Sequence, residues 1–147
     1  YDGTIRIPIR GALEKPGELD RVIAHEFTHA VIRGLAPRGV PTWLNEGLAT
    51  ALEREDSEAA ADDQDRSVPQ PRLGSLRASF GPMTPAEAKV AYTTSARAAR
   101  WLLENAGSFA VVNLLRDIGD DVPFERAFMN RIQRSVASFE SELTTSR

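Results

Sequence analysis

Both histidines of this 147-residue chain lie four positions apart, at His25 and His29. On a helix, residues four apart stand one turn apart on the same face, so two imidazoles can reach one metal ion. Glu26 lies about 100° further round the helix, where a carboxylate can accept a proton from a metal-bound water. The pattern predicts a zinc site with Glu26 as general base. The alternative is a pair of helix histidines that pack or cap beside an exposed Glu26.

A catalytic zinc ion needs a third protein ligand and an open fourth position. The chain has no cysteine and its two histidines are already used, so the third ligand must be a carboxylate. Glu46 is the natural choice, because it follows a loop that turns the chain back and stands among apolar residues. Glu18 and Asp20 lie too close to the histidines along the chain to fold back onto the same metal. The alternative for Glu46 is a half-exposed helix residue without a ligand role.

The composition restricts the class of protein and its partners. Hydrophobic residues make up 41% of the chain, charged residues 27%, and the net charge is -3, as in ordinary globular domains. A nucleic-acid binder usually has a basic excess, so we expect no nucleic-acid partner. No apolar run reaches the roughly 18 residues of a membrane span, so we expect no membrane segment. Because the chain begins with Tyr rather than Met, we expect a single domain from a longer protein, whose compartment the sequence leaves open.

The two motifs are expected to lie on two helices. Apolar residues recur at three- and four-residue steps from Glu18 to Arg33, which predicts a helix that carries both histidines. After a loop, Thr42 is expected to cap a second helix from Trp43 to Arg54. Gly47 lacks a side chain, which indicates that another backbone comes close to this second helix.

The remaining segments set the expected fold class. Residues 4–10 alternate Ile with Arg or Pro, which predicts a sheet-edge strand. No second strand of equal quality follows, so this strand must pair with upstream residues or with a second copy, as in a homodimer. Residues 53–66 hold seven acidic and two basic residues and no large apolar ones, and we predict a mobile loop region over 53–83. Thr84 and Glu87 predict a capping box for the next helix. The expected class is α+β and mostly helical, with a short N-terminal edge strand followed by five or six helices.

The two motifs together resemble a known family. The segment from His25 to His29, a gap of 16 residues and then Glu46 within residues 43–49 resemble the gluzincin metallopeptidases. The bacterial peptidase-MA-like domains, related to the aminopeptidase N group, look most similar. Residues 3–8 resemble the edge strand that precedes the zinc helix, and residues 91–95 resemble the stretch with the family's transition-state tyrosine. The resemblance implies that residues 1–147 are one zincin-like metallopeptidase domain.

The resemblance also implies roles for individual residues. His25, His29 and Glu46 would bind Zn²⁺, with Glu26 as general base. Tyr92 would donate a hydrogen bond to the tetrahedral oxyanion, although by residue type alone a Tyr on an Ala-rich helix is a packing residue. The implied reaction is hydrolysis of a peptide or protein substrate that lies extended along the edge strand.

Two departures and two alternatives accompany this interpretation. Thermolysin-like members place an Asp four residues after the ligand Glu to orient a histidine, and Thr50 stands at that position here. The chain is also short for a full gluzincin, whose upstream sheet is usually larger. No aminopeptidase Gly-x-Met-Glu-Asn element stands in the given residues, which favours an endopeptidase unless that element lies upstream. One alternative is a zinc-stabilised module that binds a peptide or protein without turnover. The other is a zinc hydrolase that acts on a non-peptide bond.

Overall fold

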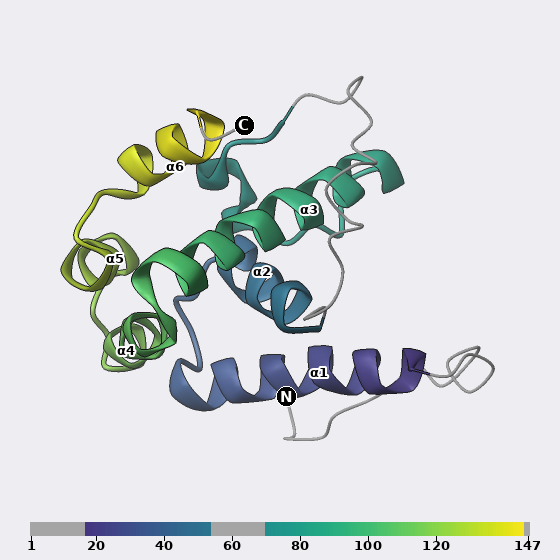
Figure 1. The fold of residues 1–147 in the computed structure, drawn as a ribbon, viewed down its shortest axis with the longest axis horizontal. Helices are drawn as coiled ribbons and strands as arrows, with labels where there is room; N and C mark the ends of the chain where they lie inside the picture. Colours follow the sequence, from purple (N-terminus) through teal and green to yellow (C-terminus); the bar gives the residue numbers. More distant parts are fainter. Residues whose placement is uncertain (1–16, 54–69, 146–147) are drawn as a thin grey trace.

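Helices dominate the computed structural model, which describes residues 17–53 and 70–145 (Figure 1). In chain order the elements are α1 (Glu18–Leu35), α2 (Thr42–Glu53), the 3-10 helix η2 (Leu73–Arg77), α3 (Pro85–Trp101), the π-helical turn η3 (Leu102–Ala106), α4 (Ser108–Gly119), α5 (Phe124–Ile132) and α6 (Val136–Thr145). The two helices predicted to carry the metal-binding motifs therefore exist as α1 and α2, with ends close to those expected.

The predicted start of α3 is confirmed in detail. The Thr84 side chain accepts a hydrogen bond from the backbone N–H of Glu87, whose carboxylate accepts one from the backbone N–H of Thr84 at 2.8 Å. This reciprocal capping box satisfies two amides that have no partner within the helix. The helical segment ends at Gly107, where φ is 84°. That left-handed value favours glycine, since a Cβ would be strained there.

Helix α2 is the central element, because it packs against α1 on one side and most extensively against α3 on another (Figure 1). Gly47 lies where α2 crosses α3. A Cβ at this position would stand 2.3 Å from the backbone oxygen of Ser95, far inside van der Waals contact. The sequence prediction of a close backbone approach at Gly47 is confirmed, and the approaching backbone belongs to α3.

An aromatic cluster joins α2 to the C-terminal helices. Trp43 is 1% exposed, and its ring lies 6.0 Å from that of Phe124 and 6.2 Å from that of Phe139, between ring centroids. Phe139 also contacts Trp101 at the end of α3, with centroids 5.2 Å apart. Each such ring buries roughly 150–250 Å² of surface. The cluster fixes α2, and with it Glu46, against the rest of the core.

The predicted α+β class is wrong for the part of the chain that the structure describes. Within residues 17–53 and 70–145 every regular element is a helix, and these residues contain no strand and no sheet. The edge strand expected at residues 4–10 lies outside the described residues. The class depended on that one strand, and the described residues, whose apolar positions recur with helical periodicity, supply no strand that could pair with it.

The predicted loop region over 53–83 is only partly described, and residues 54–69 lie outside the described residues. Within 70–83, Leu73 and Leu76 of η2 are 1% and 0% exposed, and Phe80 is also buried. This part of the region therefore packs into the core. Over residues 17–53 and 70–145, no helix combines the length and apolar character needed to cross a membrane.

Candidate metal centre

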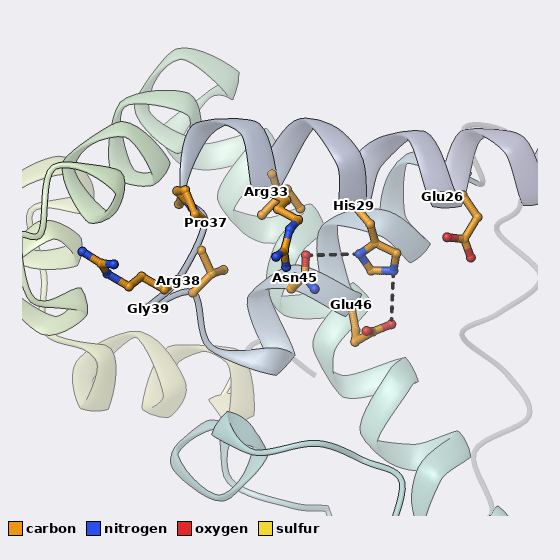
Figure 2. Close-up of a pocket in the computed structure, with 11 residues that line it drawn as sticks. Glu26, His29, Arg33, Pro37, Arg38, Gly39, Asn45 and Glu46 are labelled. Carbon is orange, nitrogen blue, oxygen red and sulfur yellow. Dashed lines mark hydrogen bonds and ion pairs between the residues drawn. The ribbon is translucent and has the colours of Figure 1, made fainter. Parts of the chain in front are cut away.

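A cleft of about 310 Å³ lies between α1 and the first turns of α2 (Figure 2). The loop between these helices reverses the chain and brings α2 back along α1. Helix α4 packs closely against the start of this loop at Gly119. A Cβ on Gly119 would lie only 2.0 Å from the backbone oxygen of Leu35. Glu26, His29 and Glu46 line one end of the cleft.

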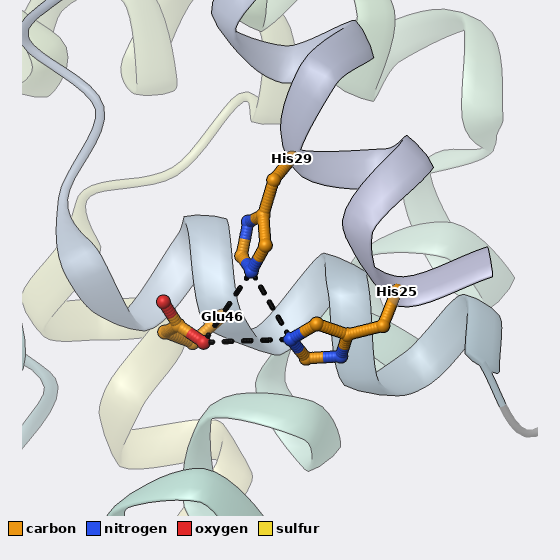
Figure 3. A group of neighbouring side chains, drawn as sticks. All are labelled: His25, His29 and Glu46. Atoms are coloured by element: carbon orange, nitrogen blue, oxygen red, sulfur yellow. Dashed lines mark hydrogen bonds and ion pairs between the residues drawn. The ribbon is translucent and has the colours of Figure 1, made fainter. Parts of the chain in front are cut away.

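Three side chains from the two helices converge at this end (Figure 3). The Nε2 atoms of His25 and His29 are 3.1 Å apart, and the two rings are nearly perpendicular. Oε2 of Glu46 lies 3.9 Å from Nε2 of His25 and 3.7 Å from Nε2 of His29. The structure thus brings together the three residues that the sequence suggested as ligands, and each keeps about a fifth of its side chain exposed.

Hydrogen bonds on the far side of each ring orient the imidazoles. Nδ1 of His25 lies 3.1 Å from Oε2 of Glu53, and Nδ1 of His29 lies 3.1 Å from Oδ1 of Asn45. A carboxylate and an amide oxygen only accept hydrogen bonds, so each Nδ1 must carry the hydrogen. In the neutral rings, both Nε2 atoms then present lone pairs toward Glu46.

This arrangement fits a bound cation. Two imidazole lone pairs and a carboxylate oxygen would repel one another at these distances without a positive charge between them. A tetrahedral ion with bonds of about 2.0–2.1 Å holds its ligand atoms about 3.3–3.4 Å apart. The three measured separations, 3.1, 3.7 and 3.9 Å, lie around that value. Two histidines and one carboxylate suit Zn²⁺ and leave a position for water, and imidazole ligands also suit other transition metals.

Glu26 adjoins this centre from the same turn of α1 as His25. It is half-buried and lines the cleft with His29 and Glu46. Figure 2 shows its carboxylate projecting from α1 on the side of the cleft that these two residues occupy. A carboxylate in this place can hold and transfer a proton of a reactant bound in the cleft.

Tyr92 belongs to α3, and its ring packs edge to face on Phe80 with centroids 5.2 Å apart. Partial burial raises the pKa of Tyr92 above its ordinary value, and the negative charge of Glu46 raises it further. The phenol is therefore within electrostatic reach of the candidate metal centre. It stays protonated at neutral pH, so it keeps a hydrogen to donate, and 39% of the residue is exposed.

Sequence reasoning missed the partners that orient the histidines. Glu53, rather than a residue at position 50, is the carboxylate that contacts Nδ1 of His25. Its other oxygen, Oε1, accepts hydrogen bonds from the Arg21 guanidinium at 2.7 and 3.1 Å. The spacing of the residues could have identified Glu53. It follows Glu46 by seven residues, so the two lie two helical turns apart on the same face of α2.

Comparisons of this chain with protein-family models, with curated proteins and with solved structures found no match. A functional assignment therefore depends on the residues of the site and on their geometry.

Proposed function

We propose that this chain is a zinc-dependent metallopeptidase of the gluzincin type, in which Zn²⁺ is held by His25, His29 and Glu46. The observation that carries the proposal is the convergence of two Nε2 lone pairs and a carboxylate oxygen beside Glu26, at one end of an open cleft. A structural zinc site normally closes all four positions with protein ligands. The three ligands found among the described residues and the adjoining acid favour catalysis.

Each residue of the site has a separate role in the proposed hydrolysis. Bound zinc would supply Lewis acidity, which lowers the pKa of water and polarises a carbonyl group. Glu26 accepts a proton from the water that attacks the peptide carbonyl, and then delivers it to the leaving amine. Tyr92 donates a hydrogen bond to the oxygen on which negative charge develops. Glu53 and Asn45 hold the imidazoles in the tautomer that the site needs.

The decisive experiment compares zinc content and hydrolysis in Glu26→Gln and in the unaltered chain. We expect the variant to keep its zinc, because Glu26 is not a ligand, and to lose cleavage of a quenched fluorescent peptide library. Glu104→Gln is a matched control, since Glu104 is exposed on η3 and lies outside the cleft. Equal turnover in Glu26→Gln and the unaltered chain would exclude Glu26 as the base. Stoichiometric zinc without turnover of any peptide in the unaltered chain would favour a binding module.

A further inference from the structure

The cleft extends beyond the candidate metal centre toward the end of α1. Its near end carries Glu26 and Glu46, and its far end is formed by Arg33 and the loop residues 37–40. The buried side chains of Ile32 and Ala36 form part of the wall between the two ends. The volume of about 310 Å³ is at the lower limit of sites that bind small ligands, roughly 300–1,000 Å³.

Arg33 lies on the same face of α1 as the two histidines. It follows His29 by four residues, so it lies on the same face of α1 and about 6 Å further along the helix axis. Figure 2 shows its side chain descending from α1 toward Asn45 at the start of α2, into the cleft. Arg38 points away from the candidate metal centre and pairs with Asp121 at 3.0 Å, whereas the Arg33 side chain lies beside Asn45, on the side of the candidate metal centre.

Charge within the cleft is divided between its ends. Among the described lining residues the carboxylates are Glu26 and Glu46, both at the near end, while Arg33 lies at the far end. With a divalent cation held by the three ligands, the near end carries no net charge. An anionic group bound in the far half would then meet the positive charge of Arg33 without net repulsion from the near half.

We propose that Arg33 binds a carboxylate of the substrate, one or two residues from the bond that is cleaved. Guanidinium groups bind carboxylates through two parallel hydrogen bonds, which gives both affinity and orientation. The roughly 6 Å along α1 between His29 and Arg33 is about two residues of an extended peptide. The carboxylate belongs either to an Asp or Glu side chain or to the peptide's C-terminus. This inference rests on the proposed function, since it names the substrate class of the same site.

Peptide binding tests the inference independently of turnover, in zinc-loaded protein that carries Glu26→Gln. The probes are fluorescein-labelled alanine-based hexapeptides with an amidated C-terminus and a single Glu scanned through the positions. A series with Gln in place of Glu is the neutral match, and an all-alanine peptide with a free carboxylate represents the second source. We expect at least one carboxylate peptide to bind about tenfold more tightly than its neutral match, because the interaction is charge-assisted but open to water.

Substitution of Arg33 tests whether this residue causes the preference for carboxylate peptides. Arg33→Gln should abolish the difference between the Glu and Gln peptides, and Arg33→Glu should favour a peptide with Lys at the same position. Arg116→Gln, on the exposed face of α4 and outside the cleft, should keep the preference. Equal binding of charged and neutral peptides, binding of neither, or a preference that survives Arg33→Gln would overturn the inference. Selective binding in Glu26→Gln without cleavage by the unaltered chain would uphold this inference and refute the peptidase.

Discussion

Oε2 of Glu53 lies 3.1 Å from Nδ1 of His25, and Oε1 of the same carboxylate is bound by Arg21. One side chain at the end of α2 therefore connects a candidate metal ligand on α1 to a cation one turn earlier on that helix. The carboxylate is 15% exposed, which shields its hydrogen bonds from water. This contact fixes the ring of His25 so that Nε2 faces His29 and Glu46.

Removal of Glu53 should weaken zinc binding without removing a ligand. Loss of an outer hydrogen-bond partner of a metal-binding histidine typically costs about 10- to 100-fold in metal affinity. We expect that loss for Glu53→Ala, measured by competition with a chelating dye. Glu53→Gln should lose less, because an amide oxygen can still accept the Nδ1 hydrogen. An unchanged zinc affinity in Glu53→Ala would show that the contact does not tune the site.

Glu46→Ala should have the larger effect, because it removes a ligand and leaves two histidines. We expect most of the zinc to be lost on dialysis, and an affinity loss greater than that of Glu53→Ala. Zinc content by elemental analysis and chelator competition give both values. Glu104→Ala serves as the control for loss of an exposed acid. If Glu46→Ala retained stoichiometric zinc, the third ligand would have to lie elsewhere in the chain.

Local rules explain why much of this structure could be predicted from sequence. The capping box of Thr84 and Glu87 depends on neighbours three residues apart, and it formed as predicted. The four-residue spacing of His25 and His29 follows from helix geometry alone. Gly47 indicated a close backbone contact, although its partner at Ser95, 48 positions further along the chain, could not be named in advance.

Features that depend on distant contacts could not be predicted. The pairing of His25 with Glu53 depends on how α1 and α2 pack, and the spacing of Glu46 and Glu53 shows only that both lie on one face of α2. Burial of Leu73, Leu76 and Phe80 depends on packing against α2 and α3, which lie far from them in the sequence, and polar neighbours concealed this burial within a segment expected to be irregular. The α+β class is wrong for the described residues, because every regular element among them is a helix and the class depended on one strand expected outside them, at residues 4–10.

Gly47→Ala should destabilise the fold, because the added methyl group would collide with the backbone of α3 at Ser95. Overpacking of this kind costs about 1–3 kcal/mol in the free energy of unfolding. Urea denaturation of the metal-free protein, followed by circular dichroism, measures the change. Gly34→Ala is the matched control, because nothing lies within 4 Å of its added Cβ and alanine favours helix by roughly 0.5–1 kcal/mol. Equal stability of the two variants would contradict the close contact.

The Tyr92 phenol should ionise at a higher pH than an ordinary tyrosine, because its pKa is raised. Burial is the larger cause of its raised pKa and the charge of Glu46 the smaller, so Glu46→Gln should lower the pKa only in part. The folded state holds this proton more tightly than the unfolded state. Tyr92 therefore contributes nothing to the pH dependence of stability below about pH 10 and reduces stability as pH rises through that value. Difference absorbance between the metal-free protein and Tyr92→Phe measures this titration.

Kinetics of Tyr92→Phe should separate catalysis from packing. The phenyl ring can keep its contact with Phe80, so the fold and the zinc content should be unchanged. Loss of one hydrogen-bond donor to a developing oxyanion typically lowers kcat by about 10²-fold or more and changes KM little. We expect that pattern with any peptide that the unaltered chain cleaves. A kcat equal to that of the unaltered chain would make Tyr92 a packing residue, as its place on an Ala-rich helix suggests by residue type alone.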